Sequence, residues 1–238
     1  MKKILFGCLL ILNFKSFAQT KILEVDRKID TLPKTFGANL KNYLQMYIGY
    51  GFVVGQSEKG AAIKYGSSSD FVLGFRYKRK IGNVYSIGYD LNYHRTSFYL
   101  VQNSMKIIPD TILHDKEKFV FNAFGLSLYN RFNFDNHRGN YMGYFLDLGA
   151  GGDWDFNIKT VSEDKINGNI VTTSTKKLKY VNPYNYYAFT RLGFNKYILS
   201  AAYRISDQFI DSLAKVYGSY KNYPELPRII IGLQIGFY

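Results

Sequence analysis

Cysteine is nearly absent from this sequence: the single cysteine among 238 residues is Cys8, in an apolar segment near the N-terminus. One cysteine forms no intrachain disulfide, and a chain that loses this segment has no thiol chemistry. Proline is also scarce, with 5 residues, as expected when most backbone N–H groups take part in β-ladders. Mean hydropathy is −0.18, and the apolar run at the N-terminus is too short to span a bilayer as a helix. A helical membrane protein is therefore excluded.

Signatures of catalysis and of metal binding are missing as well. The sequence contains no G-x-S-x-G elbow, and none of its three histidines has another at metal-ligand spacing. The glycine run 149–152 lacks the lysine and the helix of a phosphate-binding loop. We therefore expect no catalytic residues, no metal site and no cofactor.

His94 is the histidine whose neighbours in the sequence best fit a catalytic role. It is expected near the outer end of a strand, with Asp90 and Ser97 close in sequence, and some small barrels are lipid-modifying enzymes that use serine, histidine and a carboxylate at the rim. A histidine that is simply hydrogen-bonded in the barrel interior explains the same residue without any chemistry. The interpretation that we adopt is the second one, so the chain is not expected to be an enzyme.

The N-terminus has the pattern of a secretory signal over residues 1–18. Lys2 and Lys3 form the basic region, Ile4 to Leu12 the apolar region, and Ser16 to Ala18 a small-residue cleavage site, so we predict cleavage before Gln19. A lipoprotein signal at Leu5 to Cys8 is the alternative, but it would leave almost no apolar region. Residues 19–41 are polar and mixed in charge and are predicted to form a periplasmic N-terminal segment.

The chain is basic, with a formal net charge of +13 that falls to +10 without the three lysines of the signal. Nucleic acid is the usual partner of a basic chain, but we exclude it for an exported protein. Anionic headgroups of outer-membrane lipid, including anionic glycolipid, are the partners expected instead. Surface lysines that only aid solubility are the alternative.

The segment Val84 to Arg95 shows the pattern on which the fold prediction depends. Its odd positions are tyrosine, isoleucine and leucine, and its even positions are mostly small or polar, so a strand here has one apolar face and one polar face. Eight segments of this kind occur behind the signal, at about 42–55, 70–80, 84–95, 118–134, 141–154, 179–194, 197–205 and 228–238.

The connections between these segments alternate between long and short. Long polar connections are expected at 56–69, 96–116, 155–178 and 206–227, and short turns near residues 82, 137 and 195. Both termini of a membrane barrel lie in the periplasm, where its turns are short, while its outer loops are long. The sequence therefore predicts an all-β protein, an eight-stranded antiparallel up-and-down transmembrane β-barrel over residues 42–238.

Charged residues recur on the polar faces of these strands. An eight-stranded barrel is filled by side chains, and unpaired charges inside it would be costly. We therefore expect the inward charges to pair into a lumen network that holds the barrel closed, formed by Arg76, Asp90, Asp147, Asp153, Arg191, Arg204 and Arg228. A narrow polar path for ions is the functional alternative.

The sequence resembles the small outer-membrane β-barrel proteins of the OmpA, OmpX and PorT type over about residues 42–238. The resemblance rests on Leu-Asp-Leu-Gly-Ala-Gly at 146–151 and on the terminal strand Ile229 to Tyr238. It implies that the terminal aromatic pair, Phe237 and Tyr238, is the assembly signal read by the barrel-assembly machinery. It also implies localisation in the cell outer membrane and envelope or secretion proteins as partners.

Three functions remain open at this point. The leading one is a structural or interaction role for a barrel with a closed or narrow lumen. The resemblance adds a PorT-like accessory role in protein secretion or envelope assembly, and a minor porin is the third. The basic outer loops, with lysines such as Lys159, Lys165 and Lys176, are the expected contact surface for glycolipid or protein.

Overall fold

The computed structural model describes residues 35–135, 141–210 and 223–237. The predicted signal peptide, most of the segment 19–41 and Tyr238 of the predicted assembly signal lie outside the described residues. Within the described residues, no helix is long and apolar enough to cross a bilayer.

Nine strands are present in the described ranges, and eight of them correspond to the predicted ones. They are β1 (Asn42–Val54), β2 (Ser69–Lys80), β3 (Tyr85–Tyr99), β4 (Lys116–Asn133), β5 (Tyr144–Ile166), β6 (Asn169–Lys176), β7 (Tyr184–Phe194), β8 (Tyr197–Arg204) and β9 (Ile229–Phe237).

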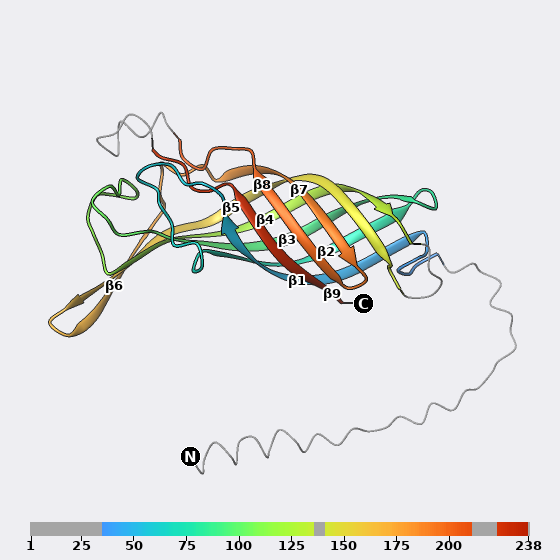
Figure 1. The fold of residues 1–238 in the computed structure, drawn as a ribbon, viewed down its shortest axis with the longest axis horizontal. Helices are drawn as coiled ribbons and strands as arrows, with labels where there is room; N and C mark the ends of the chain where they lie inside the picture. Colours follow the sequence, from blue (N-terminus) through green and yellow to red (C-terminus); the bar gives the residue numbers. More distant parts are fainter. Residues whose placement is uncertain (1–34, 136–140, 211–222, 238) are drawn as a thin grey trace, which may run out of the picture. The chain divides into compact units, whose positions relative to one another are not determined.

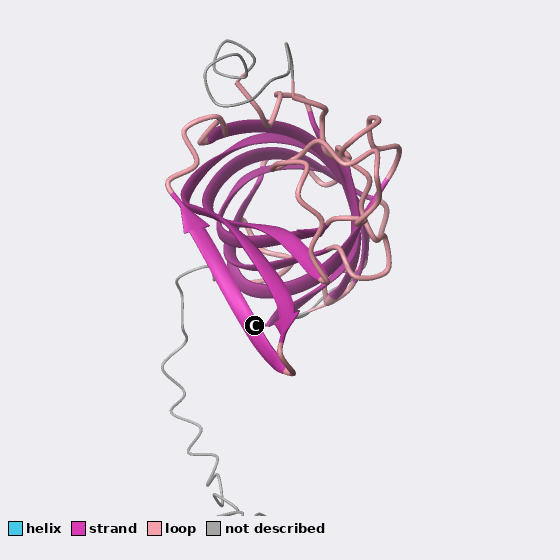
Figure 2. Ribbon diagram, turned by 90° about the vertical axis from the view of Figure 1, so that its left-hand side faces the viewer, coloured by secondary structure: helices cyan, strands magenta, loops and turns pink. Residues whose placement is uncertain are grey.

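Eight strands close into a ring in which all pairs are antiparallel. The order β4-β3-β2-β1-β9-β8-β7-β5 is completed by the pairing of β4 with β5, and β1 meets β9 from Met46↔Phe237 to Val54↔Ile229. Figure 2 shows the ring viewed nearly end-on. The predicted eight-stranded up-and-down barrel is confirmed, and with it the resemblance to small outer-membrane barrels at the level of the fold.

The region 155–178 differs from the prediction, because it is not a loop. β5 continues to Ile166 and turns back into β6, and this hairpin projects beyond the barrel (Figure 1). Its turn is Asn167-Gly168, with φ of 51° and 82°, the residue pair and backbone that favour a two-residue hairpin. Within the described ranges β6 pairs only with β5, and all eight of its residues are exposed.

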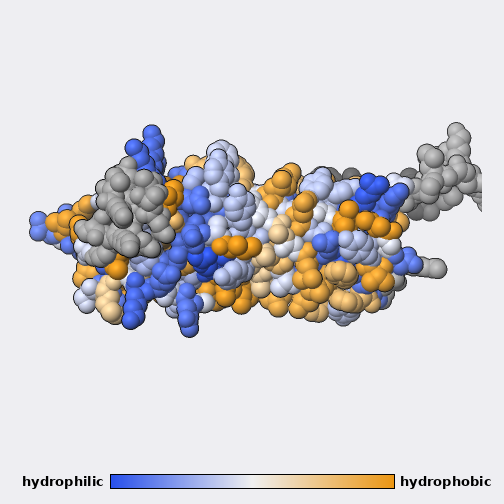
Figure 3. Space-filling view, turned by 90° about the horizontal axis from the view of Figure 1, so that it is seen from above, coloured by the Kyte–Doolittle hydropathy of each residue, from blue (hydrophilic) through white to orange (hydrophobic). Residues whose placement is uncertain are grey.

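The barrel wall has apolar residues outside and polar residues inside. On β4, for example, Phe124, Leu126 and Leu128 are exposed while Ser127 and Arg131 are buried. Figure 3 shows hydrophobic side chains over the barrel wall and hydrophilic ones gathered toward its ends. Water would make such an outer face unfavourable, whereas acyl chains solvate it, so the wall has the polarity of a membrane-spanning barrel.

The two ends of the barrel differ in the length of their connections. We call the end with connections 81–84, 134–143 and 195–196 the turn end, and the opposite end the loop end. The loop end carries connections 55–68, 100–115, 167–183 and 205–228.

A register shift between Asn122 and Ala123 interrupts β4–β5 pairing. Phe156 is therefore an extra residue of β5, and the inward positions of β5 change parity after it.

Candidate functional site

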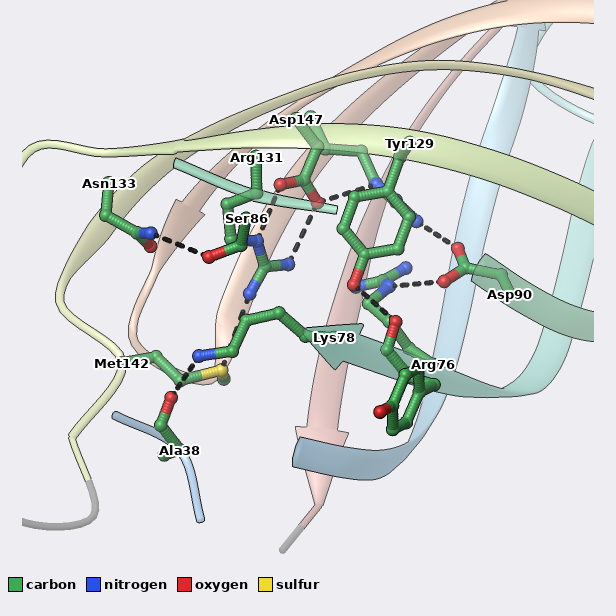
Figure 4. Close-up of polar contacts among 12 residues, drawn as sticks. Ala38, Arg76, Lys78, Ser86, Asp90, Tyr129, Arg131, Asn133, Met142 and Asp147 are labelled. Atoms are coloured by element: carbon green, nitrogen blue, oxygen red, sulfur yellow. Dashed lines mark hydrogen bonds and ion pairs between the residues drawn. The ribbon is translucent and has the colours of Figure 1, made fainter. Parts of the chain in front are cut away.

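The lumen contains an ionic network of five side chains from five strands. They are Arg76 on β2, Asp90 on β3, Arg131 on β4, Asp147 on β5 and Arg191 on β7. Each lies on the inward face because its strand alternates polar and apolar residues, and the side chain of each is at most 3% exposed. Figure 4 labels four of the five, Arg76, Asp90, Arg131 and Asp147.

The five groups form a chain in which positive and negative charges alternate. Arg76 Nε lies 3.0 Å from Asp90 Oδ1, and Arg191 donates a hydrogen bond to the other oxygen of Asp90. Arg191 Nε also lies 3.2 Å from Asp147 Oδ2, and Arg131 donates to both oxygens of Asp147 at 2.7 and 2.9 Å. Because Arg191 joins both carboxylates, the two ion pairs act as one unit across the lumen.

Aromatic rings cover the guanidinium groups. The Arg131 guanidinium carbon lies 3.5 Å from the ring centroid of Phe145, that of Arg76 lies 4.2 Å from Tyr47, and that of Arg191 lies 4.4 Å from Phe189. Arginine over an aromatic face is favourable, and more so away from water. Three arginines therefore share two carboxylates, with the rings as additional partners.

Glycine at position 193 makes room for one of these rings. A Cβ atom at Gly193 would lie 2.0 Å from the Cζ atom of Phe145, so any larger residue would displace the ring that stacks on Arg131. The small residues of the inward face are thus needed for the dense packing of the lumen.

The turn end is covered by residues 35–41, which precede β1. Lys78 donates a hydrogen bond to the Ala38 carbonyl, and Asn39 Nδ2 donates to the Tyr141 carbonyl at 2.5 Å. An apolar cluster packs beneath this segment, formed by Ala38, Tyr43, Met142, Phe145 and Ile198. The described part of the predicted periplasmic segment is therefore packed against the barrel.

The loop end is covered by its own hydrophobic core. Residues from all four long connections converge on inward-facing phenylalanines of β3 and β4, and Phe209 lies 5.9 Å from Phe119 between ring centroids. The cluster comprises Val53, Ala61, Ile63, Phe98, Leu100, Ile108, Phe119, Phe121, Val181, Phe209, Tyr223 and Leu226. Between this core and the ionic network lies a cavity of about 140 Å³.

Three residues of the predicted network lie apart from it. Arg204 pairs with Glu225 at 3.3 Å and Arg228 with Asp207, so these arginines face carboxylates supplied by the last long connection. Asp153 lies against Gly125, toward the loop end. The expected single network is thus divided, because loop carboxylates take over the arginines nearest the loop end.

Arg131 was not predicted as a member of the network. The sequence does carry the signal that identifies it, since Arg131 shares parity with Ala123, Gly125 and Ser127 on the inward face of β4. Following the inward positions to the end of the strand would therefore have predicted that Arg131 faces the lumen.

The geometry around His94 differs from that of a catalytic triad. Its Nδ1 lies 3.3 Å from Asp70 Oδ2, whereas Asp90 is held by two arginines. Ser97 has the opposite parity to His94 on β3 and pairs with Val120 on the outward face. His94 is thus placed as a hydrogen-bonded histidine of the lumen.

One group of side chains, Asp110, His114 and Glu117, has the spacing of metal ligands. The Lys106 ammonium lies among them, donating to Glu117 Oε2 at 2.5 Å and lying 3.7 Å from Asp110 Oδ1. Lysine supplies here the positive charge that a metal ion would bring. The cluster fastens connection 100–115 to β4, and we assign no metal to it.

Acidification is expected to loosen the contact between connection 100–115 and β5. His114 Nδ1 lies 2.7 Å from Asp164 Oδ2, and this hydrogen bond is the main cause that lowers the pKa of the Asp164 carboxyl. Because the pKa of Asp164 is lower in the folded chain than in the unfolded chain, the ionised Asp164 carboxyl stabilises the folded chain. This stabilisation is complete above about pH 4, the ordinary pKa of the carboxyl, and is lost as the pH falls through the lower pKa of the folded chain.

Hydrogen exchange of the segment 100–115, followed by mass spectrometry and corrected for the intrinsic pH dependence of exchange, measures this effect. Protection should fall a few-fold between about pH 6 and pH 3. The variant Asp164→Asn should show the low protection at both pH values. An unchanged pH dependence in this variant would assign the effect to another group.

Solved structures similar to this chain include two of the same protein. No family model and no curated protein matches the chain. The crystal structure of Ail, the attachment invasion locus protein of Yersinia pestis, is 16% identical, with 82% of this chain and 95% of that chain covered and a TM-score of 0.35. Ail in complex with the heparin analogue sucrose octasulfate is 14% identical, with 81% and 94% covered and a TM-score of 0.31.

Proposed function

We propose that this chain is an integral outer-membrane barrel with a closed lumen and a structural and interaction role. The observation that carries the proposal is the ionic network, which spans the lumen from β2 to β7 with side chains at most 3% exposed. The covers at both ends of the barrel support it. Closure by charge pairs and rings favours a sealed barrel over a minor porin, because ions would have to break buried pairs to pass.

Conductance in planar bilayers tests this proposal. The full-length mature barrel should insert and show no steady conductance, while a general porin inserted in the same bilayer gives open-channel steps. Insertion is verified separately, by protection of the barrel strands from protease added to both sides. Steady conductance by the inserted barrel would reject the closed lumen and favour the porin.

The β5–β6 hairpin supports an interaction role. Among the described strands, β5 is the one partner of β6, and all residues of β6 are exposed. Exposed N–H and C=O groups on the outer edge of such a strand can pair with a strand of another protein. Ile170 and Val171 are exposed on this strand. An envelope or secretion protein that adds a strand here would give the chain a PorT-like accessory role, which is the alternative function. No enzymatic activity is part of either proposal.

Membrane insertion by the barrel-assembly machinery completes the proposal. β9 is the closing strand of the barrel, and Phe237 lies at its end on the outward face, paired with Met46 of β1. An exposed aromatic residue at the end of the last strand is accessible to a receptor before closure. We assign the recognition to Phe237, while Tyr238 lies outside the described residues.

A further inference from the structure

A cluster of aromatic side chains marks the loop-end border of the apolar band on β3, β4 and β5. Phe124 and Phe156 are stacked with 4.8 Å between ring centroids, Tyr93 lies 6.1 Å from Phe124, and Trp154 lies 6.3 Å from Phe156. The rings of residues 124, 154 and 156 are exposed. Aromatic residues of this kind lie at the level of lipid headgroups.

Basic side chains lie directly beyond this cluster on the same outward face. Arg95 is opposite Asn122, Lys118 is opposite Tyr99, and Lys159 is opposite Val120. Opposed residues share a face of the sheet, and Lys118 and Lys159 are diagonal neighbours about 7–8 Å apart at their backbones. Within the described parts of the chain, no ion pair joins any of the three cations to a carboxylate. We call Arg95, Lys118 and Lys159 the basic wall.

A recess adjoins the basic wall where connection 55–68 passes β3 and β4. It has a volume of about 320 Å³ and is lined by Lys64, Ser67, Tyr99, Leu100, Lys116 and Glu117. The one carboxylate of this lining, Glu117, is paired with Lys106. The Lys118 ammonium lies 3.1 Å from the Tyr99 hydroxyl, at the edge of this recess. Ammonium and hydroxyl groups together offer several hydrogen-bond donors to a phosphate.

We propose that the basic wall and its recess bind the phosphorylated sugar headgroup of an outer-leaflet glycolipid, with the acyl chains against the aromatic cluster. The apolar band, the rings and the cations follow one another along the same three strands, in the order of acyl chain, interface and headgroup. Arginine and lysine bind phosphate through charge-assisted hydrogen bonds. An acidic protein segment would match the cations but would leave the adjoining aromatic cluster without a role.

This inference rests on the proposed membrane location, and fluorescence titration tests it. The single tryptophan of the sequence, Trp154, belongs to the aromatic cluster and reports binding directly. The folded barrel in zwitterionic micelles is titrated with diphosphoryl lipid A and with the same lipid after removal of its phosphates. The diphosphoryl form should bind at least tenfold more tightly, because each cation near an anionic headgroup contributes roughly fivefold.

A triple variant and a charge-matched control locate the site. Arg95→Gln, Lys118→Gln and Lys159→Gln together should weaken binding of diphosphoryl lipid A at least tenfold. The control triple, Lys59→Gln, Lys177→Gln and Lys179→Gln, removes the same charge from exposed positions and should change binding less than about twofold. Cooperative unfolding of each protein verifies that it is folded.

Three results would overturn the proposal: equal weakening by both triples, equal binding of both lipid forms, or displacement of the lipid by a polyglutamate peptide at equal charge. The first would show a diffuse charge effect, the second an apolar one, and the third an acidic protein partner. A barrel that inserts into bilayers but gives any of these results loses only the glycolipid site. A barrel that does not insert loses the proposed function itself.

Discussion

Asp147→Asn is expected to lower the free energy of unfolding by about 3–5 kcal/mol. The carboxylate of Asp147 is 0% exposed and holds Arg131 through two hydrogen bonds and Arg191 through an ion pair. Neutralising it leaves the three guanidinium groups of the network with one carboxylate, that of Asp90, which pairs with Arg76 and Arg191. Arg131 then loses its carboxylate partner in the network. Removal of one partner of a buried ion pair is costly because the uncompensated charge stays buried.

Urea unfolding of the barrel in lipid vesicles, followed by Trp154 fluorescence, measures this loss. Glu163→Gln is the matched control, since the Glu163 carboxylate pairs with Lys116 at 3.4 Å and both side chains are accessible. Exposed pairs contribute about 0–1 kcal/mol. If the two variants destabilised the barrel equally, the network would have no special part in holding the barrel together.

Leu128→Arg is expected to destabilise the inserted barrel by about 2–4 kcal/mol. Leu128 is 67% exposed on the outward face of β4, midway between the exposed Phe124 and Phe132, and it lies opposite Tyr89 on β3 and Ala150 on β5. In water an exposed leucine is replaced by arginine at little cost, whereas near the middle of a bilayer the charged group must leave its hydration. The size of the effect therefore reports which solvent contacts the wall.

Ile170→Arg provides the control for this prediction. Ile170 is 66% exposed on β6, in the hairpin that projects beyond the barrel (Figure 1), and its replacement should change stability by less than about 0.5 kcal/mol. Unfolding in vesicles is compared for both variants and the parent chain. Small and equal effects at the two positions would mean that the wall faces water, and the membrane-spanning assignment would then be wrong.

The strands of the barrel could be predicted because each has a period-two pattern with an apolar and a polar face. That pattern also identified Arg76, Asp90, Asp147 and Arg191 as inward residues. It did not reveal the hairpin β5–β6, whose few apolar residues, among them Ile170 and Val171, do not alternate with polar ones, so that the segment resembles a loop. The dipeptide Asn167-Gly168 was the available signal for a hairpin turn. It predicts a hairpin only where strands can be recognised on both sides, and this segment has no apolar alternation to identify them.

The partners of the inward charges could not be predicted from parity alone. Arg204 and Arg228 have inward or rim positions, but their carboxylate partners, Glu225 and Asp207, come from a long connection. Only the path of that connection decides which arginines remain for Asp90 and Asp147. The extra residue Phe156 at the register shift between Asn122 and Ala123 likewise changes which residues of β5 face inward.

The sequence by itself determined that this protein is a barrel with an apolar exterior and a charged interior, because side-chain alternation is a local property of each strand. The tertiary structure alone decided how the interior charges pair, how residues 35–41 and the long connections cover the two ends, and which cations gather on β3, β4 and β5. Those features depend on the shear of the closed ring and on loop paths, which bring together residues that are far apart in the sequence.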